Sequence, residues 1–85
     1  MKDFTYVIKD SVGIHARPAG LLVKKAMEFK SEILLECKGK TADAKKIFSV
    51  MGLAAKCGDD VIVKVSGEDE TRAADEMEQF FKENL

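Results

Sequence analysis

The stretch Val61-Ile62-Val63-Lys64-Val65 is the clearest strand signal in the chain. Its β-branched residues favour extended backbone, and a short apolar run of this kind is typical of a buried strand. Gly58-Asp59-Asp60 precedes it and Gly67 follows it, so the chain is expected to turn at both ends. The remaining elements can be placed on either side of this strand.

A helix is expected after it. The acidic run Glu68-Asp69-Glu70 complements the positive end of a helix dipole. Apolar residues then recur at helical spacing on one face, with two more beside them: Ala74, Met77 and Phe81, flanked by Ala73 and Phe80. We expect the end of this helix to fray over residues 82–85.

Periodicity also predicts the elements that come before the strand. They are strands over residues 4–8, 33–37 and 40–42, and helices over residues 16–26 and 45–53. Pro18 suits the first turn of a helix, where a missing N–H group costs little. Lys38-Gly39 suits the tight turn of a hairpin between the second and third strands.

The order of the predicted elements is therefore βαββαβα. Each helix has one apolar stripe and the strands have one strongly apolar face, which a sheet covered by helices on one side would satisfy. We expect an α+β two-layer sandwich. A length of 85 residues leaves room for one core, so we expect one domain over residues 1–85.

Composition excludes several classes of function. The 14 basic and 15 acidic residues give a formal net charge of -1, whereas a general nucleic-acid binder has a basic patch. No apolar run approaches the roughly 20 residues that span a bilayer. Residues 1–10 lack the apolar core of a signal peptide. We therefore expect a cytoplasmic protein that neither binds nucleic acid nor inserts into a membrane.

The residues that bear redox and metal chemistry are few. Cys37 and Cys57 form neither a CxxC redox motif nor a zinc-finger pattern, and we expect both to be reduced, small and buried. His15 is the only histidine, and its segment contains no second ligand or base. No metal, cofactor or catalytic triad is therefore expected.

The unusual segment is Gly13-Ile14-His15-Ala16-Arg17-Pro18-Ala19. His15 stands directly before a predicted helix, where the N–H groups of Ala16 and Arg17 are free to bind an anion. The guanidinium of Arg17 has a fork that matches phosphate oxygens, so the segment suits a reversible phosphoryl acceptor. A histidine at a helix start can equally be a weak cap or a surface residue beside a solvated arginine, and the spacing leaves that alternative open.

The same segment resembles the active-site signature of the histidine-containing phosphocarrier (HPr) family of the bacterial sugar phosphotransferase system. The likeness continues through Lys38-Gly39-Lys40, residues 45–53 and Val65-Ser66-Gly67-Glu68-Asp69-Glu70, and the length also matches. The resemblance implies an open-faced sandwich, with four antiparallel strands and three helices on one face. It also implies a carrier rather than an enzyme.

The resemblance further implies what the site residues do. Nδ1 of His15 would accept a phosphoryl group from phosphorylated enzyme I, which draws it from phosphoenolpyruvate. The group would then pass to a histidine of a sugar-specific IIA domain. Arg17 would support the phosphate, together with the backbone N–H groups of Ala16 and Arg17.

An apolar patch is the candidate surface for docking these partners, and it would draw on two helices: Gly20 and Leu21 in the first, and Ile47, Phe48 and Met51 in the second. Ile47 and Met51 can equally be core residues. Phe48 does not share their face fully, so it is the stronger candidate for an exposed contact. Family members dock enzyme I and IIA domains through a patch between these helices, and a monomer suits such a carrier.

Lys46 departs from the family pattern. Many relatives carry a regulatory serine at this position, but Lys46 has no hydroxyl and cannot be phosphorylated in the same way. Lysine is also a poor N-cap and opposes the helix dipole, so we expect a less ordered helix start, with Asp43 capping from upstream. Ser49 lies within the predicted helix, and we do not assign the regulatory role to it.

Two other functions compete with the sugar carrier. One is a carrier in a paralogous phosphorelay, of the nitrogen-related or another regulatory type, which the missing serine makes harder to dismiss. The other is an adaptor that binds partners without being phosphorylated. An adaptor would not require both His15 and Arg17, so the pair argues against it.

Overall fold

The strand that is clearest in the sequence lies inside the sheet. In the computed structural model, which describes all 85 residues, β4 (Asp60–Ser66) pairs with β1 (Lys2–Val7) on one side and β2 (Glu32–Cys37) on the other. The hairpin partner of β2, β3 (Lys40–Asp43), forms the far edge. The strand order is β1-β4-β2-β3 and every pairing is antiparallel.

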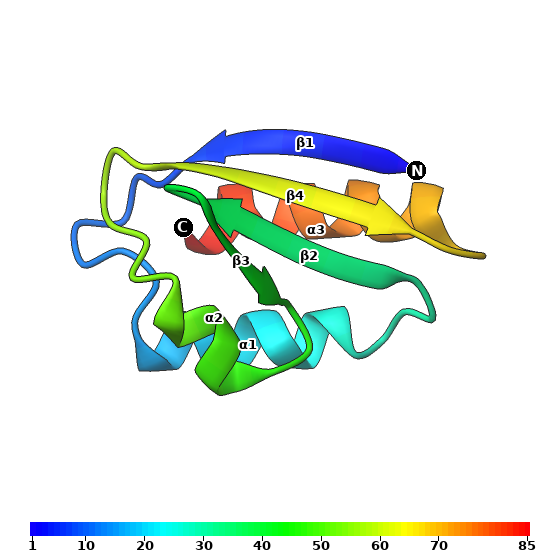
Figure 1. Cartoon of the computed structure of the whole chain (residues 1–85), viewed down its shortest axis with the longest axis horizontal. Coiled ribbons are helices and arrows are strands. Elements are labelled where there is room, and N and C mark those ends of the chain that lie inside the picture. Colours follow the sequence, from blue (N-terminus) through cyan, green and yellow to red (C-terminus); the bar gives the residue numbers. More distant parts are fainter.

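Three helices complete the order βαββαβα: α1 (Ala16–Ala26), α2 (Ile47–Gly52) and α3 (Glu70–Asn84). Figure 1 shows the sheet with its four strands and the helices packed against it. This arrangement confirms the predicted α+β open sandwich. None of the helices combines the length and apolar character required to cross a bilayer.

Every second residue of the central strands contributes its side chain to the core. In β2 and β4, alternate residues are fully buried, whereas those between them remain partly exposed. The buried set facing the helices is Ile33, Leu35, Cys37, Val61, Val63 and Val65. Antiparallel pairing aligns these residues across the strands, with Val63 opposite both Phe4 and Leu35. In the two central strands, one face of the sheet is therefore apolar along its whole length.

The helices cover that face with the stripes that the sequence predicts. The buried positions are Pro18, Ala19, Leu22 and Ala26 in α1, and Ala73, Ala74, Met77 and Phe81 in α3. The Phe81 ring meets Phe4 and Tyr6 edge to face, with ring centroids 5.8 and 5.6 Å away. Such aromatic pairs fix how α3 lies against β1.

Three expectations are corrected. Cys37 is buried, but Cys57 is exposed in the loop before β4, so the prediction that both are core residues is wrong. The end of α3 is not frayed, because Leu85 is buried and its carbonyl oxygen accepts the N–H groups of Lys9 and Asp10 at 2.6 and 2.7 Å. The second helix is shorter than residues 45–53.

Candidate functional site

The loop that carries His15 packs against the backbone of residues 54–56 and is hydrogen-bonded to it. Gly13 has a φ of 80°, and a Cβ at this position would lie 2.3 Å from the carbonyl oxygen of Ala55. That oxygen accepts the N–H group of Ile14 at 2.9 Å, and the Ile14 side chain is buried. Glycine is therefore required here for its backbone conformation and for space. These contacts of Gly13 and Ile14 set the position of the backbone at His15.

The supporting segment is itself held at Asp59. Its carboxylate accepts the Lys56 N–H at 2.8 Å and forms an ion pair with Lys38 at 2.8 Å. These two groups, the Lys38 ammonium first, lower the pKa of Asp59 below its ordinary value. The positive-φ hairpin turn at Lys38-Gly39 therefore also anchors the loop that underlies the site.

His15 presents its ring at the start of α1. It occupies the N-cap position in an extended conformation, its side chain makes no capping bond, and the residue is exposed. Its carbonyl oxygen accepts the Ala19 N–H at 2.9 Å, but the N–H groups of Ala16 and Arg17 donate to no protein acceptor. Pro18 has no N–H group. Two free donors thus lie beside the imidazole, as the sequence predicts.

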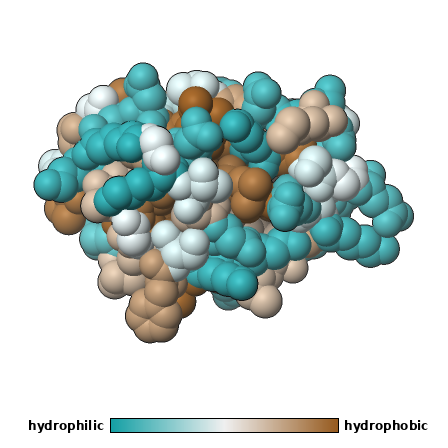
Figure 2. Space-filling view, viewed as in Figure 1, coloured by the Kyte–Doolittle hydropathy of each residue, from teal (hydrophilic) through white to brown (hydrophobic).

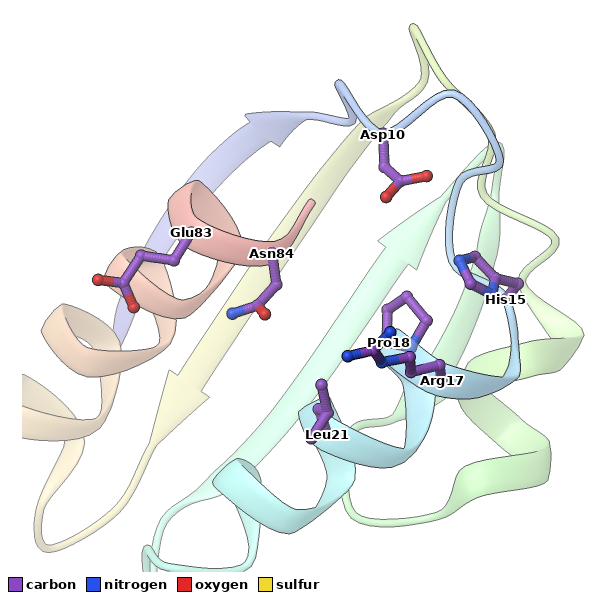
Figure 3. A pocket seen from close by; sticks show the side chains of 7 residues that line it. All are labelled: Asp10, His15, Arg17, Pro18, Leu21, Glu83 and Asn84. Carbon is purple, nitrogen blue, oxygen red and sulfur yellow. The ribbon is translucent and has the colours of Figure 1, made fainter.

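Arg17 supplies a positive charge that the protein leaves unpaired. Its side chain is exposed and enters none of the ion pairs of the structure, and the first turn of α1 contains no acidic residue. In Figure 3 it extends toward the end of α3 and away from the His15 ring. The guanidinium is therefore available to an anionic ligand.

A shallow depression of about 230 Å³ joins these groups to residues far away in the sequence. Its lining comes from the loop before α1, from α1 itself and from the end of α3: Asp10, His15, Arg17, Pro18, Leu21, Glu83 and Asn84 (Figure 3). Asp10, Glu83 and Asn84 were not expected here. No local pattern marks them, because α3 runs parallel to β1, so that its end meets the loop that follows β1.

Of the expected docking residues, three are exposed at the surface and the other two lie between α1 and α2. Leu21, Phe48 and Met51 are exposed by 43%, 85% and 38%, and Figure 2 shows an apolar projection over α2. Ile47 instead packs against the core, with its Cδ1 atom 3.7 Å from the point where a Gly20 Cβ would lie. A side chain at Gly20 would thus make an ordinary van der Waals contact with Ile47, and both residues lie where α1 and α2 meet.

The start of α2 lacks a side-chain cap. Lys46 occupies the N-cap position without a capping bond, as expected for lysine. Asp43 acts one turn earlier: its carboxylate accepts the Lys45 N–H at 2.9 Å, and its carbonyl oxygen accepts the Lys46 N–H. Ser49 accepts the Asp43 N–H at 3.0 Å, so its half-buried hydroxyl belongs to the same turn.

Comparison with known proteins places this site in a family. Residues 2–83 match the PTS-HPr family, described as the PTS HPr component phosphorylation site. The phosphocarrier protein HPr of Lysinibacillus sphaericus is 47% identical over 73 residues, which cover 86% of this chain and 83% of that protein. HPr of Mycoplasma genitalium is 45% identical over 74 residues, or 86% of this chain and 84% of the relative.

Solved structures agree. The histidine-containing phosphocarrier protein of Mycoplasma has a TM-score of 0.93 at 34% identity, covering 96% of this chain and 93% of its own. HPr of Thermoanaerobacter tengcongensis has a TM-score of 0.93 at 36% identity, covering 99% and 94%. Sequence and fold together show that the chain belongs to the HPr family of phosphotransferase-system phosphocarriers, which are carrier proteins rather than enzymes.

Proposed function

We propose that His15 accepts a phosphoryl group from phosphorylated enzyme I and passes it to a histidine of a sugar-specific IIA domain. The observation that carries this proposal is the exposed imidazole beside two unpaired N–H groups and an unpaired guanidinium, those of Ala16 and Arg17. Each of these groups favours an anion at this place. Membership of the HPr family supports the same role.

The proposed transfer is a displacement at phosphorus. The lone pair on Nδ1 of His15 attacks phosphorus as the bond between phosphorus and the donor breaks. Charge on the three phosphoryl oxygens is then stabilised by the N–H groups of Ala16 and Arg17 and by the guanidinium of Arg17. In the second transfer the acceptor histidine attacks phosphorus, and the Nδ1–P bond breaks.

The apolar patch of Leu21, Phe48 and Met51 is the proposed docking surface for both partners. It adjoins the depression through Leu21, which lines both. Ile47 and Gly20 would lie beneath it, where Ile47 packs against the core and α1 meets α2. Residues 1–85 would act as one carrier domain, a cytoplasmic monomer that presents this surface to one partner at a time.

A carrier in a paralogous phosphorelay is the second candidate. Lys46 favours it, because a lysine at the start of α2 removes the hydroxyl that sugar-type relatives use for regulation. The two functions differ in the enzyme I that they accept. Faster loading by a nitrogen-type enzyme I than by a sugar-type one would favour the paralogous relay.

Labelled phosphoenolpyruvate and a sugar-type enzyme I test the carrier role. We expect acid-labile, base-stable label on the wild type, onward transfer to a IIA domain, and no label on His15→Ala. Because the His15 side chain is exposed, the variant should keep the circular dichroism spectrum of the wild type. If no enzyme I loads the wild type, the protein is not a phosphocarrier, and capture of partners by the unmodified chain would indicate an adaptor.

A further inference from the structure

One carboxylate faces the proposed phosphoryl site from outside the signature segment. Asp10 lies between β1 and α1, and in Figure 3 its carboxylate is directed into the depression that His15 and Arg17 also line. A phosphoryl group on His15 would carry close to two negative charges at neutral pH. Asp10 would repel this group, whereas Arg17 would attract it.

The backbone and side chain of Asp10 are both held in place. Its N–H group donates to the carbonyl oxygen of Leu85 at 2.7 Å, and its own carbonyl oxygen accepts the Gly13 N–H at 3.0 Å. Its Oδ1 atom accepts the Val12 N–H at 2.9 Å. A carboxylate fixed in this way cannot turn away from a new negative charge as a freely exposed one can.

The other polar groups from α3 are turned to other partners. The Glu83 carboxylate accepts the Nε2–H of Gln79 at 3.1 Å, and in Figure 3 it points away from His15. The Asn84 amide donates to the carbonyl oxygen of Phe80 at 3.0 Å. Asp10 is therefore the carboxylate of the depression that is directed toward His15.

We propose that Asp10 sets the phosphoryl-transfer potential of His15, an inference that rests on the proposed function. Its charge raises the free energy of the phosphorylated protein relative to the unmodified one, and so favours onward transfer. Asp10 acts through its charge and its fixed position without touching the phosphoryl group. Interactions between exposed charges reach about 1 kcal/mol, so removing this one should shift the equilibrium by up to about fivefold.

Phosphoryl exchange between two versions of the protein measures this shift directly. Isotope-labelled wild type is first loaded from phosphoenolpyruvate and enzyme I, and then freed of phosphoenolpyruvate. It is mixed with an unlabelled variant and a trace of enzyme I until exchange is complete. Intact mass spectrometry at neutral pH then gives the phosphorylated fraction of each partner, and their ratio is the relative transfer potential.

Paired variants separate the charge of Asp10 from its role in the turn. Asp10→Asn keeps an oxygen for the Val12 N–H but loses the charge. Its equilibrium ratio of phosphorylated to unmodified protein should exceed that of the wild type by up to about fivefold. Asp10→Glu keeps the charge and should stay close to the wild type. Asp75→Asn makes the same charge change on the exposed face of α3 and should give a ratio near one.

High salt provides a second readout, since screening should reduce the shift caused by Asp10→Asn. Phosphorylation of the wild type by enzyme I tests the proposed function, whereas the ratio of the phosphorylated fractions of Asp10→Asn and the wild type tests the role of Asp10. An Asp10→Asn ratio near one on a wild type that loads normally would overturn the inference and leave the carrier role intact. A large shift for Asp10→Glu without one for Asp10→Asn would overturn it too, because the turn would then be the cause.

Discussion

The starts of α1 and α3 differ in how their polar groups are used. Neither N-cap residue makes a side-chain capping bond, but the first turn of α3 contains Glu70, whereas that of α1 contains no acidic residue. At the start of α3, Glu70 accepts the Gly67 N–H at 3.1 Å, and Asp69 accepts three bonds from the N–H of Lys30 and from the N–H and hydroxyl of Ser31. Polar groups satisfied within the protein hold the fold together, whereas groups left unpaired remain available to a ligand.

The same contrast extends to the arginines that follow each start. Arg72 lies near Asp69 and Glu76, with N–O distances of 3.7 and 3.6 Å, and its guanidinium carbon is 4.9 Å from the centroid of the Phe29 ring. Arg17 has no such partner. The structure therefore assigns one arginine to packing and leaves the other to interact with an anion.

Exchanging each arginine for alanine should separate the two roles most strongly. Arg17→Ala should slow phosphoryl transfer on the order of 10²-fold, because it removes one charged donor from the transition state, with no change in the unfolding midpoint. Arg72→Ala should leave transfer unchanged and lower the free energy of unfolding by up to about 1 kcal/mol. Rapid-quench assays measure the rate of phosphoryl transfer of each variant, and urea titrations measure its free energy of unfolding. Unfolding of Arg17→Ala would show instead that this residue is structural.

Acid should weaken the α3 start. The hydroxyl of Ser31 and the N–H group of Lys30 lower the pKa of Asp69 from 3.8 to about 2. Because the pKa is depressed in the folded protein, this carboxylate contributes its full stability above pH 3.8 and loses it as the pH falls toward about 2. Urea midpoints measured across this range should fall more steeply for the wild type than for Asp69→Asn. Equal slopes would contradict the assignment.

The start of α2 should show the smallest effect. Lys46→Ser would add the missing N-cap and should raise the free energy of unfolding by about 0.5–1 kcal/mol. In the wild type, the amides of the first turn, at Phe48 and Ser49, should exchange faster than that of the buried Val50. If these amides are as protected as the helix interior, then Asp43 alone orders the turn and the uncapped lysine has no cost.

Local patterns predicted most of the scaffold. The alternation in β4 and the apolar stripe of α3 each reflect a single buried face, which a few residues of sequence are enough to reveal. The position of His15 at the start of α1 was also predictable, because the residue and the helix that follows it are contiguous in the chain. In the short helix α2, only Val50 is buried, and periodicity could not separate the exposed Met51 from the core.

Contacts between distant segments could not be predicted in this way. The bond from Ser31 to Asp69 joins residues 38 apart, and Asp10 meets the end of α3 only because α3 returns along β1. Leu85 is ordered by its burial and by the backbone of Lys9 and Asp10, neither of which its own neighbours in sequence reveal. Cys57 is exposed in the turn before β4, and its Sγ contacts the carbonyl oxygen of Lys9, 48 residues away in the sequence, at 3.8 Å.

The phosphorylated protein tests the central claim most directly, through its NMR spectrum. After loading from enzyme I, the phosphorus nucleus should couple to Nδ1 of His15, and the backbone amides of Ala16 and Arg17 should show the largest shifts as they begin to donate to phosphoryl oxygens. The amides of Lys30 and Ser31 should remain unchanged, because Asp69 already satisfies them. Phosphorus bound to another residue, or no shift at Ala16 and Arg17, would contradict the account.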